Sequence, residues 1–391
     1  MFDLLRLLRC LFIAGSLAAG GCSVIRGEKS LTDVIQPQSI SDHTGRALRK
    51  ATGREINPNV AKQLYASAEE LHRRGLDSQG EEREEALVEA AELFVKAADR
   101  WPSSVLEEDA LYMAGESYYF TDYYPKASAL YQTLLKKYPQ TRYLDTVGVR
   151  SYRIAVYWLE WHEEDPRSFW SWNFSDPRRP RRSDFTDAVK TFDRIRLDDP
   201  TGELADDATL AAGNAYFASN KYENADRFYS DLRKTFPSSK HQFTAHMLGL
   251  KAKMLTYQGH EYSGHMLDEA EELVKKINKQ FPRDSQQRKD ELNKAYYDIL
   301  RLKAEREWEK ARYYDRRKEY GAARFHYHML ESKYPQTPYA DEARQRLAEL
   351  QGEPDMPESR LQWLSDLFPA HTDKESKPIF GGDGFRLPWQ R

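Results

Sequence analysis

The amino-acid sequence predicts an all-α protein, a superhelical solenoid built from helical hairpins. Three observations predict this class. The pentapeptide KYPQT occurs twice, at residues 137–141 and 333–337. Pro139, Pro237 and Pro335 are equally spaced, 98 residues apart. Small and aromatic residues recur at constant offsets before each proline, and segments with the alternating pattern of a β-strand are nearly absent. Recurrence of this kind is typical of a repeat array.

The repeat is strongest in the units that end at Pro139 and Pro237. Both units have the same residue at seven positions with equal offsets from the proline. Alanine or glycine at one point of a helix allows a second helix to approach closely, and the tyrosines fill the space on either side. We therefore expect Gly115 and Gly213 at close helix crossings. The matching residues are Ala114 with Ala212, Gly115 with Gly213, Tyr118 with Tyr216, Tyr124 with Tyr222, Ala127 with Ala225, Tyr131 with Tyr229, and Leu134 with Leu232; in the unit that ends at Pro335, Ala311, Tyr314, Tyr320, Ala323, Tyr327 and Leu330 continue the pattern.

Each KYPQT-like segment is predicted to end one helix and to begin the next. Cations such as Lys136 and Lys137 stand at the carboxyl end of the first helix, where they complement its dipole. Proline then stops the helix. Two residues later comes a residue that favours the N-cap position. The predicted N-caps are Ser104, Thr141, Ser239, Asp284 and Thr337, with Gly202 after Pro200.

Six helix-ending prolines predict six units over residues 60–335. A terminal helix over residues 340–350 completes a predicted domain that extends from residue 60 to residue 351. Residues 352–391 are rich in proline and glycine and are expected to lack a fixed fold. The six prolines are Pro102, Pro139, Pro200, Pro237, Pro282 and Pro335.

Three of the units depart from the regular length. The first unit has a charged segment at residues 75–83 that is expected to form a loop. The third unit carries about 21 extra residues, which we place as an insertion at 163–184. The last unit begins with a long charged helix, predicted over residues 285–317.

The N-terminus has the pattern of an export signal. Two arginines precede a short apolar run at residues 10–19, and small residues follow it. Residues 1–21 are therefore a predicted signal peptide, and the AGGC sequence at its end resembles a bacterial lipoprotein box. That resemblance implies lipidation of Cys22, followed by a flexible tether over residues 22–59. The alternative is an ordinary secretory signal with an incidental cysteine. Because the other cysteine is Cys10, within the signal, the lipidated chain has no disulfide.

Composition and motifs point away from chemistry on small molecules. The formal net charge is -3, which gives no indication of nucleic-acid binding. No nucleophile elbow, P-loop, HExxH, Cys/His cluster or dinucleotide-binding glycine pattern is present. Paired carboxylates on amphipathic helices are typical of a solvated face. The sequence therefore predicts no enzyme, no small-molecule substrate, no cofactor and no metal.

The insertion contains the candidate binding residues. Residues 168–185 read SFWSWNFSDPRRPRRSDF, a cluster of aromatic residues followed by arginines. Tryptophan and arginine are enriched among residues that dominate the energy of protein interfaces. We predict Trp170 and Trp172 as apolar anchors of a partner, with Arg178 and Arg179 as charge-pairing residues. In the alternative, the aromatic residues fold back to fill a gap between helices while the arginines lie in water.

The repeat residues closely resemble tetratricopeptide repeats. Two blocks also resemble the BamD family of outer-membrane assembly lipoproteins: LYASAEEL, AAELFVKAADRWPSS and YPKASALYQTLLKKYPQT between residues 64 and 141, and WEKARYYDRRKEYGAARFHYHMLESKYPQTPYADEA at 308–343. The insertion falls in the third unit, where that family has one. Residues 203–282 look like repeats added to the family's five.

The BamD resemblance implies a non-catalytic scaffold that is lipid-anchored in the outer membrane and faces the periplasm. Its implied partners are a barrel-assembly protein with periplasmic domains and the clients of that protein. The alternative is a periplasmic tetratricopeptide adaptor for cell-wall or division machinery. Such an adaptor would share the repeats but would need neither the insertion nor the same partner.

Overall fold

The computed structural model describes residues 55–165 and 172–357. Within these two ranges the regular secondary structure consists of 14 helices and no strand, which confirms the predicted all-α class. The contacts divide the chain into two compact units, one ending at Tyr138 and one beginning at Pro139. None of the described helices is both long and apolar enough to cross a membrane. The predicted signal peptide, Cys22 and Trp170 lie outside the described residues.

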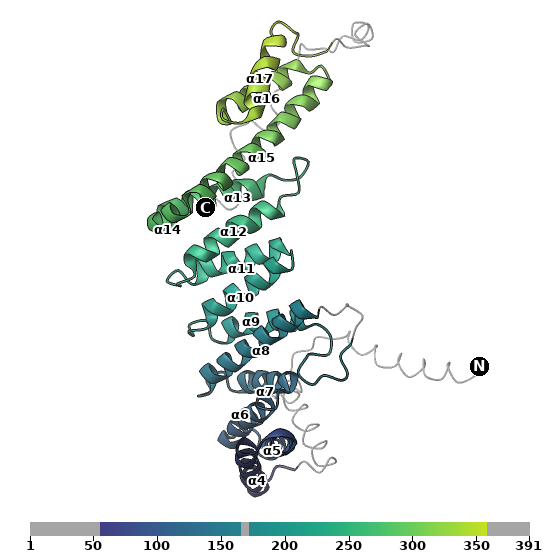
Figure 1. The fold of residues 1–391 in the computed structure, drawn as a ribbon, viewed down its shortest axis with the longest axis vertical. Helices are drawn as coiled ribbons and strands as arrows, with labels where there is room; N and C mark the ends of the chain where they lie inside the picture. The colour runs from purple at the N-terminus through teal and green to yellow at the C-terminus, as the bar shows by residue number, and fades with distance from the viewer. Residues whose placement is uncertain (1–54, 166–171, 358–391) are drawn as a thin grey trace, which may run out of the picture. The chain divides into compact units, whose positions relative to one another are not determined.

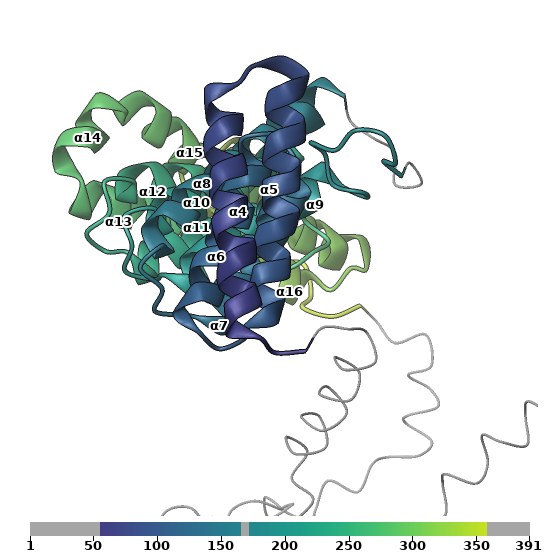
Figure 2. The ribbon, with the colours of Figure 1, turned by 90° about the horizontal axis from the view of Figure 1, so that it is seen from below.

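The first compact unit contains two helical hairpins. Its helices are α4 (Pro58–Asp77), α5 (Gly80–Arg100), α6 (Val105–Tyr119) and α7 (Tyr124–Lys137). Figure 2 shows α4 and α5 side by side, joined by a short turn. The predicted loop at 75–83 is wrong, because only Ser78 and Gln79 separate these helices. Gly75 belongs to α4 and faces Leu87, and a Cβ on Gly75 would lie 2.7 Å from Cγ of Leu87. This glycine therefore permits close packing and does not break the helix.

The second compact unit contains four more hairpins and the terminal helix, stacked in chain order (Figure 1). The prediction of six hairpin units and a final helix is thereby confirmed for the described chain. The helices are α8 (Leu144–Glu164), α9 (Asp184–Asp198), α10 (Ala205–Ala218), α11 (Tyr222–Thr235), α12 (Gln242–Thr256), α13 (His265–Gln280), α14 (Pro282–Gln287), α15 (Lys289–Arg316), α16 (Tyr320–Lys333) and α17 (Pro338–Glu349).

The long helix predicted for the last unit is interrupted in the structure. The segment divides into the short α14 and the 28-residue α15. The two meet at Arg288, whose φ of -107° and ψ of 22° depart from helical values. The residues of α15 that match the repeat, Ala311 and Tyr314, lie near its carboxyl end. The first part of α15 packs on α13.

The turns inside three hairpins share one geometry. A residue with positive φ stands two positions before the second helix: Asp122 (61°), Asn220 (58°) and Lys318 (60°). Aspartate and asparagine tolerate this region, and their side chains accept hydrogen bonds here. The Tyr124 hydroxyl donates to Asp122 Oδ1 over 2.8 Å, and the Tyr222 hydroxyl donates to Asn220 Oδ1 over 2.7 Å. In these two of the three turns, the recurring tyrosine at the start of the second helix thus holds the turn residue.

The close crossings predicted at Gly115 and Gly213 are present within the hairpins. A Cβ on Gly115 would lie 2.5 Å from Cε1 of Tyr131, and a Cβ on Gly213 would lie 2.7 Å from Cε1 of Tyr229. Both tyrosine rings are almost fully buried. The Tyr131 hydroxyl donates to Glu116 Oε1 over 2.6 Å, which satisfies its polar atom inside the core. The glycine therefore makes room for a tyrosine ring from the partner helix.

Only some of the predicted N-cap residues, two positions after each helix-ending proline, cap a helix in the structure. Ser104 is the N-cap of α6, and its hydroxyl accepts from the backbone N–H of Glu107 over 3.1 Å. Thr337 is the N-cap of α17. At Thr141 and Ser239 the helix starts three residues later, because each hydroxyl accepts from a backbone N–H two residues on and prolongs the turn. Asp284 is not a cap, since it lies inside α14.

Candidate protein-binding site

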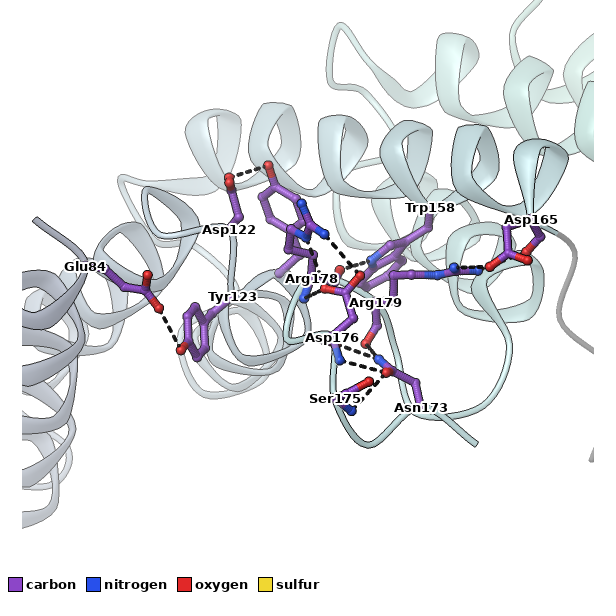
Figure 3. A network of polar contacts seen from close by, with 11 residues as sticks. Glu84, Asp122, Tyr123, Trp158, Asp165, Asn173, Ser175, Asp176, Arg178 and Arg179 are labelled. Atoms are coloured by element: carbon purple, nitrogen blue, oxygen red, sulfur yellow. Dashed lines mark hydrogen bonds and ion pairs between the residues drawn. The ribbon is translucent and has the colours of Figure 1, made fainter. Parts of the chain in front are cut away.

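The insertion joins α8 to α9 and is fastened to both by Arg179. The Arg179 side chain is 6% exposed, and its Nη2 lies 2.6 Å from Oδ2 of Asp184, which is 1% exposed. Its Nη1 lies 2.7 Å from Oδ2 of Asp165, as Figure 3 shows. The guanidinium carbon also lies 4.8 Å from the centre of the Trp161 ring. A buried cation with two carboxylates and an aromatic ring is a structural anchor for the loop.

The loop around Arg179 is held by its own hydrogen bonds (Figure 3). Nδ2 of Asn173 donates to the carbonyls of Asp176 and Arg179 over 2.6 and 2.8 Å, and its Oδ1 accepts from the backbone N–H of Asp176 over 2.9 Å. The indole Nε1 of Trp158 donates to the carbonyl of Arg178 over 2.9 Å. One amide and one indole therefore satisfy the backbone of the turn, which gives this part of the insertion a defined shape.

Arg178 lies at the surface of the same loop. Its Nε lies 3.0 Å from Oδ1 of Asp176, and its side chain is about half exposed. Burial on its own raises the pKa of the Asp176 carboxyl, but hydrogen bonds from Arg178 lower it below its usual range overall. Arg178 thus pairs within the insertion, in a position that is open to solvent.

The structure agrees fully with neither alternative for the insertion, exposed aromatic anchors with pairing arginines or packed aromatic residues with arginines in water. Trp172 is 47% exposed and Phe174 is 83% exposed, and their rings stack with centres 6.1 Å apart. The described aromatic residues of the insertion are therefore at the surface, while Arg179 is the side chain that packs inside. Trp172 and Arg178 are accessible to a partner, and Arg179 is not.

A groove of about 1240 Å³ runs along the insertion, between α8, α9 and the end of α10. Leu159, Trp172 and Phe185 contribute apolar surface to its lining. Its basic lining residues are Arg181 and Arg182 from the insertion, Lys190 from α9, and Lys221 from the turn before α11, which is more distant in sequence. We call this lined cavity the insertion groove. Phe185 ends the aromatic and basic segment at 168–185, but Lys190 and Lys221 lie outside it, and no sequence motif links them to it.

Two of these cations are placed by aromatic rings. The guanidinium carbon of Arg182 lies 4.7 Å from the centre of the Trp172 ring, and Nζ of Lys221 lies 4.3 Å from the centre of the Phe185 ring. Attraction between a cation and an aromatic face is worth about 0.5–1 kcal/mol at exposed sites. Each cation is therefore oriented at the groove by a ring, and within residues 55–165 and 172–357 neither forms an ion pair with a carboxylate.

A second cavity, of about 620 Å³, lies between α11, α12 and α13. Its buried Lys253 has its Nζ 2.6 Å from Oδ2 of Asp226 and also pairs with Glu269. Nη1 of Arg233 donates to the carbonyl of Ala245 over 2.9 Å. Lys253 and Arg233 are thus satisfied within the protein, whereas among the described residues Arg182 and Lys221 of the insertion groove contact aromatic rings and no carboxylate, which makes the insertion groove the better candidate for a partner.

Two family models match parts of this sequence, one for a tetratricopeptide repeat and one for an outer membrane lipoprotein. Residues 109–141 match a tetratricopeptide repeat model, and residues 178–353 match a family described as outer membrane lipoprotein, YfiO. The predicted resemblance to BamD-like lipoproteins is confirmed by these matches. The lipoprotein match begins within the insertion and includes residues 203–282, the repeats that seemed to be additions to the family pattern.

Two solved structures also align with most of the chain. The C-terminal part of a repeat-containing protein from Cytophaga hutchinsonii is 13% identical, with 73% of this chain and 99% of that chain covered and a TM-score of 0.28. A tetratricopeptide repeat protein from Parabacteroides merdae is 14% identical, with 73% and 100% covered and a TM-score of 0.28. No curated protein matches the chain significantly.

Proposed function

We propose, from the match of residues 178–353 to the outer membrane lipoprotein family, that this chain is a non-catalytic, lipid-anchored scaffold. It binds proteins during the assembly of β-barrel proteins in the outer membrane, and it faces the periplasm. The match carries the proposal because it covers the last residues of the insertion, α9 of the third hairpin, the fourth to sixth hairpins and the terminal helix. Tetratricopeptide arrays bind protein segments along their exposed surfaces, so the activity required is binding and not bond cleavage.

In this proposal the N-terminus supplies the membrane attachment. Residues 1–21 are removed as a signal, Cys22 carries the lipid, and the chain up to residue 59 is a tether to the repeats. One acyl chain gives only marginal membrane binding, so stable attachment needs the two or three chains of a mature lipoprotein. The repeat domain then reaches its partners in the periplasm, and residues 352–391 remain as a tail.

The insertion is the proposed contact surface. Trp170, Trp172 and Arg178 keep the role of partner anchors, and truncation of such anchors typically costs about 2 kcal/mol or more of binding energy. The burial of Arg179 supports a different role for that residue, which is to hold the loop in one conformation. A loop that is already ordered loses less entropy when a partner binds, and this raises affinity.

The location of the chain can be tested with Cys22→Ser. When this variant is the sole copy in its bacterium, we expect it to leave the outer-membrane fraction and the amount of folded barrel proteins to fall. Wild type expressed at the same level is the control. A variant that fractionates like the wild type would disprove the lipid anchor. Unchanged barrel proteins after depletion of the whole chain would disprove the assembly role and favour an adaptor for cell-wall or division machinery.

A further inference from the structure

We propose that the insertion groove binds an extended, acidic protein segment that carries an aromatic or large aliphatic side chain. This inference rests on the proposed function, because it specifies the kind of segment that the scaffold recognises. The apolar part of the segment would lie against Trp172 and Phe185, and its carboxylates would pair with the surrounding cations.

The charge of the lining favours an acidic occupant. Four cations line the groove, and among the described residues none of the four forms an ion pair with a carboxylate. Elsewhere in the same compact unit, cations such as Lys253, Lys303 and Arg346 have carboxylate partners within 2.7 Å. Cations that converge on one apolar cavity without carboxylate partners provide electrostatic complementarity to an acidic chain.

The position of the rings explains why the occupant needs an apolar side chain as well. Arg182 and Lys221 lie over Trp172 and Phe185, so each ring has a cation on one face. The apolar lining of the groove comes from Trp172, which is 47% exposed, and from Leu159, Ala215, Ala218 and the largely buried Phe185. A side chain that buries itself there would displace water next to the cations and strengthen their attraction for neighbouring carboxylates.

The same lining disfavours a nucleic acid. Glu163 and Asp187 also line the groove, and both would repel a chain with a phosphate at every position. A peptide avoids this repulsion, because its carboxylates can be spaced to meet the cations while its neutral or basic residues face the two acids. The groove volume of about 1240 Å³ exceeds that of an ordinary small-molecule pocket, which is about 300–1,000 Å³, and so suits several residues of extended chain.

Binding of a defined peptide to the detergent-solubilised full chain tests this inference. The probe is a fluorescein-labelled peptide in which aspartate alternates with phenylalanine, measured by fluorescence anisotropy. We expect binding that weakens as salt is raised. Two further probes replace aspartate by lysine or phenylalanine by alanine, and both should bind about tenfold or more weakly, which corresponds to about 1.4 kcal/mol or more.

The matched protein variants are Arg182→Glu with Lys221→Glu, and Lys294→Glu with Lys333→Glu. Both pairs change the net charge equally, but Lys294 and Lys333 are exposed residues outside the groove. We expect the first pair to weaken binding about tenfold or more and the second to leave it within about twofold. Circular dichroism and a thermal melt establish that both variants are folded.

Three results would overturn the inference: equal binding of the aspartate and lysine peptides, equal loss of binding in the two charge-reversed variants, or displacement of the peptide by a single-stranded oligonucleotide at matched charge. These outcomes are separate from failure of the proposed function. The peptide measurement does not depend on Cys22 or on the membrane, so it can fail in a chain that still assembles barrel proteins.

Discussion

Replacing Arg179 with alanine is expected to destabilise the second compact unit by about 3–5 kcal/mol, the largest effect of any single substitution considered. The substitution leaves the carboxylate of Asp184, which is 1% exposed, without the cation that lies 2.6 Å away. Removing one partner of a buried ion pair costs this much because the remaining charge stays desolvated. Asp165 contributes less to this cost, because its side chain is 63% exposed.

Urea denaturation followed by circular dichroism measures this effect. Arg178→Ala is the matched control, since the neighbouring side chain is about half exposed and should change the free energy of unfolding by less than about 1 kcal/mol. The double variant Arg179→Ala with Asp184→Asn should recover part of the loss, because the buried side chain at residue 184 is then neutral. Equal stability of Arg179→Ala and wild type would show that the insertion does not depend on this anchor.

Substitution of Gly213 is expected to have the second largest effect. A leucine there should cost about 1–3 kcal/mol by overpacking the hairpin, since its Cβ alone would lie 2.7 Å from Cε1 of the buried Tyr229. The tyrosine ring would have to move, which would weaken the 2.9 Å hydrogen bond from its hydroxyl to Oδ1 of Asn214. The effect should be concentrated in the adjoining hairpins, because each repeat contacts its neighbours.

The alanine variants provide a sharper comparison for the same crossing. Gly213→Ala should destabilise the protein although alanine favours helices. Gly148→Ala should instead stabilise it by about 0.5–1 kcal/mol, because the nearest atom to a Cβ on Gly148 is Cδ1 of Leu204, at 3.9 Å. Denaturant melts of both variants measure the difference. A Gly213→Ala protein as stable as Gly148→Ala would contradict the assigned crossing.

The repeat could be predicted from sequence because its determinants are local and recur. Tyr131 and Tyr229 occupy equal offsets from a proline, so the same sequence pattern predicts the close helix crossing in both hairpins. Gly75 is different, because a glycine amid charged residues indicates a loop as readily as a close contact. Only the position of Leu87, on the next helix, decides between these two interpretations.

The candidate site was less predictable, because its contacts join residues that the sequence does not link. The composition of the insertion makes it a candidate contact segment, but composition cannot show which arginine is buried. That depends on the path of the loop, which brings Arg179 beside both Asp165 and Asp184. The stacking of Lys221 on Phe185 likewise depends on how two hairpins pack together.

We propose that the chain recruits a barrel-assembly protein through the insertion. Affinity purification of the tagged full chain from solubilised outer membrane, followed by mass spectrometry, tests it most directly. The matched variant is Trp172→Ala with Phe174→Ala, which removes the exposed stacked rings and leaves the Arg179 anchor in place. Wild type should recover a barrel protein with periplasmic domains, and the variant should recover several-fold less at equal expression. Recovery of cell-wall or division proteins in place of a barrel protein, or undiminished recovery by the folded variant, would contradict the claim.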